Sequence, residues 1–252
     1  MKYVLKIAYD GTNYGGWQIQ NNAITVQQVL QNAANTAFGQ QLNITASGRT
    51  DAGVHAAAQI CHFTADISVP ANKIADALNV HLPQDISVLS SNLADEDFDA
   101  NRSAKKKTYC YKLYFSPRRN PLKDRYSLWV KGDINEDKLV QAANLFTGEH
   151  DFKAYMASRS QVKTTVRTVY SVTVKSSFSY GSKDIEIYVC GNGFLYNMVR
   201  TMAGTILGYA QGKISEEQIK KSLLTQNRTL VGKTLPANGL TLYSVDYGKE
   251  LF

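Results

Sequence analysis

Two stretches of the sequence repeat one order of hydrophobic patterns, and this repeat limits the folds open to the chain. In residues 3–93, strand-like alternation and helical stripes follow one another as strand, helix, strand, strand, helix, strand. The same order returns, with additions, between residues 107 and 247. This is the split βαβ arrangement. The sequence therefore predicts an α+β fold of two similar halves, joined into a mixed, largely antiparallel sheet with a central ligand-binding cleft.

A short polar stretch, residues 94–104, separates the two halves and predicts a division into domains 1–104 and 105–252. Within the second half, residues 149–163 read as an irregular loop and residues 195–211 as one helix, because an apolar stripe recurs at helical spacing only in the latter.

Composition narrows the class of protein. The chain of 252 residues has a formal net charge of +7, which suits a polyanionic partner such as nucleic acid. The sequence has no apolar stretch of eighteen or more residues, the length that a membrane span needs, so no membrane association is predicted. The 3 cysteines lie far apart and no His, Cys and carboxylate set has metal-ligand spacing. We therefore expect a cytoplasmic protein without a metal site.

The basic residues are grouped, and tyrosines accompany the first group. Cations that can pair with phosphates, beside aromatic faces that can stack on bases, form the pattern typical of proteins that bind unpaired RNA. The first group comprises Lys105, Lys106, Lys107, Arg118, Arg119, Lys123 and Arg125, and the second comprises Lys153, Arg159, Lys163 and Arg167. Tyr109, Tyr111, Tyr114 and Tyr126 lie near the first group, although packing within a strand explains most tyrosines equally well.

One loop concentrates the polar chemistry of the chain. Residues 47–56 read Ser-Gly-Arg-Thr-Asp-Ala-Gly-Val-His-Ala, with two glycines bracketing the triplet Arg49-Thr50-Asp51. Glycines allow backbone angles and close approaches that other residues resist, so the loop can aim its side chains at a ligand. Taken alone, the same residues also fit an ordinary turn in which Asp51 accepts hydrogen bonds from nearby amides.

Five segments, in order along nearly the whole chain, resemble the tRNA pseudouridine synthase A (TruA) family. The most specific is Gly48-Arg49-Thr50-Asp51-Ala52-Gly53-Val54-His55-Ala56, which is similar to the signature of that family. The others are residues 9–18 (Tyr-Asp-Gly-Thr through Gly-Gly-Trp-Gln), 98–100 with 107–111 (Lys-Thr-Tyr-Cys-Tyr), 148–152 (Gly-Glu-His-Asp-Phe) and 193–200 (Gly-Phe-Leu-Tyr-Asn-Met-Val-Arg).

The resemblance implies an isomerase that converts uridine to pseudouridine at positions 38 to 40 of the tRNA anticodon arm. It implies a homodimer that needs no cofactor and a cleft that binds RNA. Asp51 takes the position of the catalytic nucleophile, Tyr109 that of the aromatic residue stacked on the target uracil, and Arg200 that of the basic residue paired with the nucleophile. Arg49 and Leu195 are further candidates for contacts with the substrate.

Other interpretations stay open at this point. A non-catalytic RNA-binding module could use the same basic residues, and a small-molecule hydrolase could use Asp51. Periodicity alone would make Tyr109 a packed strand residue and Arg200 a solvated one, while His55 could either contact RNA or hold its loop. The sequence departs from the family pattern at residues 100–104 and at Asn197, where His is common.

Overall fold

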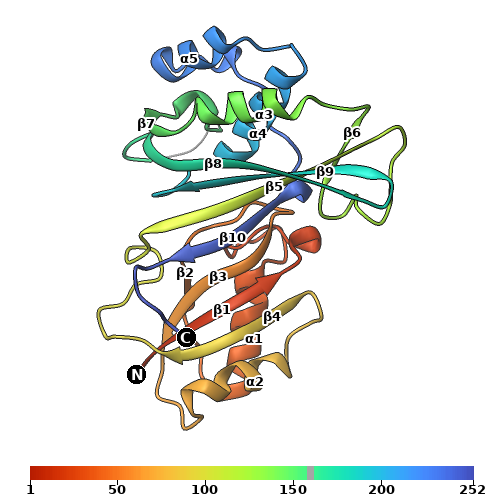
Figure 1. The fold of residues 1–252 in the computed structure, drawn as a ribbon. Coiled ribbons are helices and arrows are strands. Elements are labelled where there is room, and N and C mark those ends of the chain that lie inside the picture. The colour runs from red at the N-terminus through yellow and green to blue at the C-terminus, as the bar shows by residue number, and fades with distance from the viewer. Residues whose placement is uncertain (158–161) are drawn as a thin grey trace. The chain divides into compact units, whose positions relative to one another are not determined.

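The chain folds as α+β, as predicted, and its contacts divide it into two units (Figure 1). The first unit comprises Met1–Lys107 and Thr241–Phe252, and the second comprises Thr108–Leu240. The predicted domains 1–104 and 105–252 stay a prediction; by contacts, the last segment is grouped with the first unit. This computed structural model describes residues 1–157 and 162–252, so Arg159 of the second basic group lies outside the described residues.

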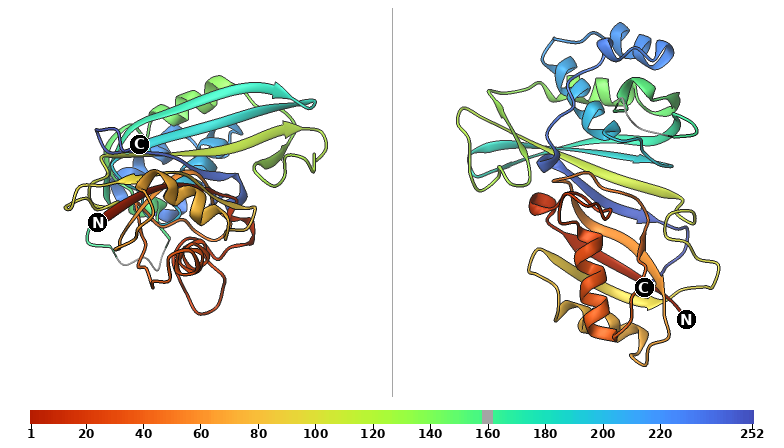
Figure 2. Two further views of the ribbon diagram at one scale, coloured as in Figure 1. Left: turned by 90° about the horizontal axis from the view of Figure 1, so that it is seen from below. Right: turned by 180° about the vertical axis from the view of Figure 1, so that it is seen from behind.

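The first unit is built on a sheet with the strand order β4-β1-β3-β10, and β2 pairs with β3 as a short addition. β3 runs antiparallel to β1 and parallel to β10, which explains why the C-terminal strand is grouped here. Two helices cover one face of this sheet (Figure 2, right). The elements are β1 (Lys2–Tyr9), α1 (Val26–Phe38), β2 (Thr45–Ala46), β3 (His55–Thr64), α2 (Ile74–Asn79), β4 (Ile86–Leu93) and β10 (Leu240–Asp246).

Both faces of β1 are covered. Neighbouring residues of a strand point to opposite faces, and both Val4 and Leu5 are completely buried. On the face of Val4, the cover is a cluster that includes Phe98, Ala100 and Tyr247, with the Tyr247 hydroxyl donating to the Ala100 carbonyl at 2.6 Å. The polar stretch that separates the predicted halves therefore contributes to the core of the first unit.

Local sequence signals set the ends of α1. The Thr25 side chain accepts a hydrogen bond from the amide of Gln28, as its N-cap position predicts, and Gly39 ends the helix in the left-handed conformation (φ 65°). Val26, Leu30, Ala33 and Ala34 form the buried stripe that packs against the sheet. In the sequence, Thr25 as a capping residue, the apolar stripe after it and Gly39 just past the stripe predict a helix between Thr25 and Gly39, and α1 begins and ends there.

The second unit has the strand order β5-β9-β8-β7, with β6 parallel to β5. β8 is antiparallel to both β7 and β9. Helix α3 packs against β8 and against α4, and α5 contacts β7. The elements are β5 (Lys106–Ser116, of which the first two residues belong to the first unit), β6 (Leu128–Lys131), α3 (Glu136–Asn144), β7 (Gly148–Asp151), β8 (Val166–Ser179), β9 (Ser182–Gly191), α4 (Met198–Ala210) and α5 (Glu216–Thr225).

Two local predictions for the second unit were wrong. Residues 149–163 are not wholly irregular, because β7 occupies Gly148–Asp151 and a turn of 3-10 helix covers Lys153–Tyr155. A strand of four residues paired to the edge of β8 is too short to show alternation in the sequence. Helix α4 begins at Met198 rather than at residue 195, because Asn197 adopts the left-handed conformation (φ 66°), which cannot continue a right-handed helix.

Within the described ranges, no helix is long and apolar enough to cross a membrane.

Candidate active site

The Asp51 loop, which we define as residues 47–54, connects β2 to β3 in the first unit. It closes as a tight turn, with the amide of Val54 donating to the Asp51 carbonyl at 3.1 Å. Thr50 is buried, Asp51 is partly buried and Arg49 is exposed. The loop therefore turns Thr50 inward and presents Arg49 to solvent, with Asp51 at the boundary.

The N-terminal segment 9–18 packs directly against this loop. The amide of Trp17 donates to the Thr50 carbonyl at 3.0 Å, and the hydroxyls of Tyr9 and Thr50 are hydrogen-bonded at 2.8 Å in a buried position. Gly16 has φ +94°, and a Cβ atom there would lie 2.5 Å from the Thr50 carbonyl oxygen. Only glycine allows this approach, so two motifs distant in the sequence form one structure around Asp51.

A second set of buried polar contacts holds the beginning of the loop. The Ser47 hydroxyl donates to Gln59 Oε1 at 2.5 Å, and Gln59 Nε2 donates to the Gly48 carbonyl at 2.7 Å. Lys107 Nζ donates to the Ser47 carbonyl at 2.5 Å, and burial lowers the pKa of this lysine. An ammonium that is partly removed from water needs acceptors in its place, and these bonds tie the loop to Lys107, the second residue of β5.

His55 follows the loop as the first residue of β3 and is buried. The amide of Gly11 donates to its Nδ1 atom at 3.0 Å. Asp10 Oδ1 lies 3.1 Å from the same nitrogen, a contact that becomes an ion pair only if the ring is protonated there and gives up the Gly11 bond. Of the two predicted roles of His55, the structure therefore shows the local one, in which the ring links the two loops.

Tyr109 lies on β5 in the second unit and is 8% exposed. Its ring meets that of Phe194 edge-to-face, with centroids 5.3 Å apart. Leu195, the next residue after Phe194, is 5% exposed. An aromatic pair of this geometry holds the tyrosine ring in a fixed plane, which is the property that a stacking partner for a base needs.

Arg200 lies in the first turn of α4 and is partly buried. Its Nε donates to the Leu235 carbonyl at 2.7 Å, and one terminal nitrogen donates to Asn197 Oδ1 at 2.7 Å. The guanidinium is therefore oriented by at least two acceptors, unlike the solvated residue that periodicity alone suggests. Asn197, one of the departures from the family pattern, contacts Arg200 directly.

The chain segment that carries the Leu235 carbonyl is itself fixed to α4. A Cβ atom at Gly204 would lie 1.9 Å from the Lys233 carbonyl oxygen, so the two backbones touch. The hydroxyls of Thr201 and Thr234 are hydrogen-bonded at 2.9 Å. The acceptor for Arg200 is thus supported by close packing rather than by an unconstrained loop.

The structure brings some of the predicted site residues together. Arg49 and Asp51 share one loop of the first unit, and Phe194 connects Tyr109 with the segment that carries Leu195 and Arg200 in the second unit. Their catalytic and binding roles stay predictions. The structure also identifies supporting residues that the sequence analysis did not select, among them Tyr9 and Gln59. Both are buried polar residues within strands. In the sequence they interrupt apolar runs, and this signal could have identified them.

Not all the cations of the basic groups face solvent. Lys107 is half-buried and donates to the Ser47 carbonyl, and Lys123 pairs with Asp184 at 2.5 Å with its side chain 9% exposed. Arg119 is exposed, but its charge is paired with Asp124 at 2.8 Å. A basic sequence cluster therefore overestimates the positive surface that it forms.

Among residues 1–157 and 162–252, no group of three or more His, Cys, Asp or Glu side chains could hold a metal ion.

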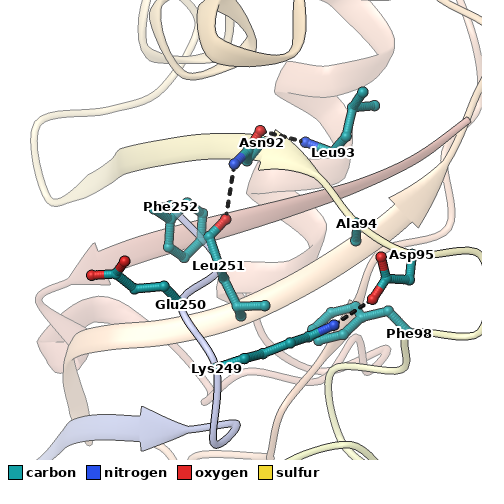
Figure 3. A pocket seen from close by; sticks show the side chains of 9 residues that line it. All are labelled: Asn92, Leu93, Ala94, Asp95, Phe98, Lys249, Glu250, Leu251 and Phe252. Carbon is teal, nitrogen blue, oxygen red and sulfur yellow. Dashed lines mark hydrogen bonds and ion pairs between the residues drawn. The ribbon is translucent and has the colours of Figure 1, made fainter.

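A small open pocket lies elsewhere in the first unit, between β4, the turn after it and the C-terminal segment (Figure 3). Asn92 Nδ2 donates to the Leu251 carbonyl at 3.0 Å across it, and Lys249 pairs with Asp95. None of the predicted site residues is part of its lining. These contacts hold the C-terminal segment against the sheet, and the pocket is the space left between the two.

Comparison with known proteins gives a consistent result across nearly the whole sequence. A family model described as tRNA pseudouridine synthase matches residues 6–101 and 142–248. The chain is 44% identical to the tRNA pseudouridine synthase A of Ruminiclostridium cellulolyticum, over 98% of this chain and 99% of that protein. It is 42% identical to the tRNA pseudouridine synthase A of Pelobacter propionicus, over 96% and 98% respectively. A structure of the archaeal box H/ACA sRNP Nop10-Cbf5 complex matches 81% of this chain and 42% of that chain with TM-score 0.35 and 12% identity.

Proposed function

The chain belongs to the tRNA pseudouridine synthase family, a family of isomerases, and from this premise we propose that it converts uridine to pseudouridine at positions 38 to 40 of the tRNA anticodon arm, with Asp51 as nucleophile. The observation that carries the proposal is the construction of the Asp51 loop. Buried contacts from Tyr9, Gly16 and Gln59 fix the backbone on both sides of a carboxylate that lies at the solvent boundary. A turn that merely connects two strands needs no such support.

The reaction exchanges one bond for another without any net change in composition. The N1–C1′ bond of uridine breaks, the uracil turns over, a C5–C1′ bond forms, and the proton on C5 is lost while N1 gains one. A carboxylate can assist by attacking C1′, by attacking the uracil ring or by removing a proton from the ribose, and each route divides a difficult step into easier ones. All three routes need an ionised Asp51.

We assign Arg200 the role of keeping Asp51 ionised in a site from which the base excludes water. A guanidinium stays protonated at any pH at which a protein is folded, and its attraction favours the charged form of a nearby carboxylate. The bonds from Arg200 to the Leu235 carbonyl and to Asn197 support this role, because they orient the guanidinium before substrate binds.

The uracil must leave the base stack to reach a carboxylate and must stay bound while it is detached from the sugar. We assign the retention of the base to Tyr109, whose ring plane is fixed by Phe194, and an apolar contact beside it to Leu195. We assign a phosphate or nucleotide contact to Arg49, because it is exposed in the same loop as Asp51.

Two further parts of the proposal concern assembly and location. We propose a homodimer in which one tRNA contacts both subunits, and a disrupted dimer should then lose activity. Because tRNA is a cytoplasmic substrate, we propose that the enzyme works in the cytoplasm. The thiols of Cys61, Cys110 and Cys190, which form no disulfide, agree with a reducing compartment.

The decisive experiment compares Asp51→Asn with the wild-type protein on tRNA, using mass spectrometry or carbodiimide mapping to count and locate pseudouridine. We expect Asp51→Asn to abolish pseudouridine formation while the affinity for tRNA changes less than about threefold, since the amide keeps the shape and loses the charge. Asp66→Asn, which alters an exposed carboxylate of the same unit, is the matched control and should leave turnover unchanged.

Near-normal turnover by Asp51→Asn would remove Asp51 from the mechanism. A wild-type protein that binds tRNA with salt-dependent affinity and yields no pseudouridine would instead favour the non-catalytic RNA-binding module. Pseudouridine at other positions would preserve the reaction and overturn the assignment to positions 38 to 40.

A further inference from the structure

The hairpin of β8 and β9 carries two exposed aromatic side chains at its end, Phe178 near the end of β8 and Tyr180 in the turn. Phe178 is 75% exposed and Tyr180 is 76% exposed. Tyr180 has φ 48° and is followed by Gly181 with φ 71°, so two successive residues are left-handed. Such turns favour Asn or Gly at the first of these positions, and a tyrosine there is strained by about 1–2 kcal/mol. The chain thus places a large exposed ring at a position that disfavours it.

Loop 117–127 lies beside this turn, at one end of the sheet of the second unit (Figures 1 and 2). Lys123 connects the two. Its Nζ donates to the Ser179 carbonyl at 2.8 Å and to Asp184 Oδ1 at 2.5 Å, and it lies 5.7 Å from the centroid of the Tyr180 ring. Because this ammonium is almost fully enclosed, the loop and the turn form one rigid surface.

The same surface carries arginines. Arg118, Arg119 and Arg125 are exposed in the loop, and the guanidinium of Arg125 lies 5.9 Å from the ring centroid of Tyr126, which is itself 48% exposed. The acidic groups near this place are paired with cations: Asp124 with Arg119, Asp184 with Lys123, and Asp133 and Glu136 with Lys183, which lies opposite Phe178 on β9. We call this set the turn surface: Arg118, Arg119, Arg125, Tyr126, Phe178 and Tyr180.

We propose that the turn surface binds unpaired bases of the tRNA substrate, with Phe178 and Tyr180 stacking on bases and the arginines contacting phosphates. The proposal rests on the proposed function for the identity of the RNA. Exposed aromatic faces beside guanidinium groups are the combination that holds unstacked nucleotides. A rigid platform serves this purpose well, because little side-chain entropy is lost when a base stacks on it.

A second copy of this chain is the competing occupant, and charge argues against it. A twofold interface brings the same patch of both copies together, so it would gather the arginines of both copies in one interface. Like charges juxtaposed in an interface are unfavourable, whereas a polyanion neutralises them and releases counterions.

The experiment measures the dissociation constant for unmodified tRNA, together with KM and kcat for pseudouridine formation. Tyr180→Gly removes the ring and relieves the left-handed strain, so this variant should fold at least as stably as the wild type. Phe178→Ser removes the other ring, and Phe178→Trp keeps an aromatic face. We expect the dissociation constant and KM to rise roughly tenfold for each of the first two variants with kcat unchanged, and to stay near wild type for Phe178→Trp.

Two matched controls lie on α5 of the same unit. Leu224→Ser removes an exposed apolar side chain that is 83% accessible, and Lys221→Glu reverses an exposed charge. Both should leave the affinity for tRNA unchanged, whereas Arg118→Glu should weaken it and flatten its dependence on salt.

The outcomes separate this inference from the function on which it rests. Unchanged affinity and KM in Tyr180→Gly and Phe178→Ser, with normal turnover, would overturn the turn surface and leave the proposed function intact. If the wild-type protein forms no pseudouridine and these variants still bind tRNA more weakly, the proposed function would be overturned and the turn surface would stand. Loss of a dimer in sedimentation, with unchanged affinity for tRNA, would overturn the proposal in favour of a second copy.

Discussion

The Asp51 loop and the beginning of α4 hold their polar side chains by different means. In the Asp51 loop the contacts are made by the backbone and by neighbours of Asp51: Trp17 and Tyr9 bond to Thr50, and Gly16 touches the same carbonyl. At α4 the contacts are made by the guanidinium of Arg200 itself, which donates to the Leu235 carbonyl and to Asn197.

The difference follows from side-chain length. An aspartate has only two side-chain torsions, so a fixed backbone leaves its carboxylate few positions. An arginine has four side-chain torsions, and fixing them costs about 2 kcal/mol of rotamer entropy. Direct hydrogen bonds to the guanidinium offset this cost. A substitution that moves the backbone should therefore harm the Asp51 loop most, and one that removes an acceptor should harm Arg200 most.

Gly16→Ala tests the backbone side of this comparison and should have the largest effect. The new Cβ would meet the Thr50 carbonyl oxygen at 2.5 Å while the residue keeps φ +94°. We expect the free energy of unfolding to fall by about 3 kcal/mol or more, and pseudouridine formation to fall by about a hundredfold, because the loop that carries Asp51 must shift. Urea unfolding and a single-turnover assay measure these two quantities.

Gly132→Ala is the matched control, because Gly132 has φ +95° and no atom within 4 Å of the added Cβ. It carries the same backbone strain without the contact, so its loss of stability should be near 1–2 kcal/mol with normal turnover. Equal losses in the two variants would show that strain alone, and not the contact with Thr50, fixes Gly16.

Asn197→Gly tests the acceptor side. Glycine suits the left-handed conformation of this residue and removes only the amide that accepts from Arg200. One charge-assisted hydrogen bond is worth about 1.5 kcal/mol or more, so we expect kcat to fall about tenfold, with KM and the melting temperature little changed. Gln226→Gly, at another left-handed residue (φ 58°), should leave kcat unchanged. An unaltered kcat in Asn197→Gly would show that the bond to Asn197 does not position Arg200 for the reaction.

The same contrast explains which parts of the fold were predictable. Helix α1 was predicted with both its ends, because its capping residues, Thr25 and Gly39, are local in the sequence. The order of strands and helices followed from periodicity for the same reason. The strand β7 and the late start of α4 were missed, because one depends on pairing with β8 and the other on the conformation of a single residue, Asn197.

The candidate site divides along the same line. Asp51, Tyr109 and Arg200 were selected through motifs, which are contiguous in the sequence. The residues that support them are contributed by other elements: Tyr9 and Gln59 from strands and Leu235 from a connecting segment. Contacts such as that between Tyr9 and Thr50 join residues distant in the sequence, and no pattern in the sequence around either residue predicts the other as its partner.

Tyr9→Phe tests the smallest contribution, the buried bond between the Tyr9 and Thr50 hydroxyls. At pH 8 we expect the variant to be less stable than the wild type by about 1 kcal/mol in urea unfolding, since Thr50 loses its partner in a buried position. The double variant Tyr9→Phe with Thr50→Val removes both hydroxyls and should recover part of this loss.

The pH dependence of that difference separates the hydroxyl from simple packing. Burial raises the pKa of Tyr9 well above its usual value of about 10. Above pH 10 the unfolded chain therefore releases a proton that the folded protein keeps, so the stabilisation by Tyr9 is complete below pH 10 and is lost as the pH rises through the window above it. Tyr9→Phe has no such proton, and the gap between the two proteins should narrow from pH 8 to pH 11. A gap that stays constant over this range would show that the Tyr9 hydroxyl ionises as readily in the folded protein as in the unfolded chain, which contradicts a buried hydroxyl bonded to Thr50.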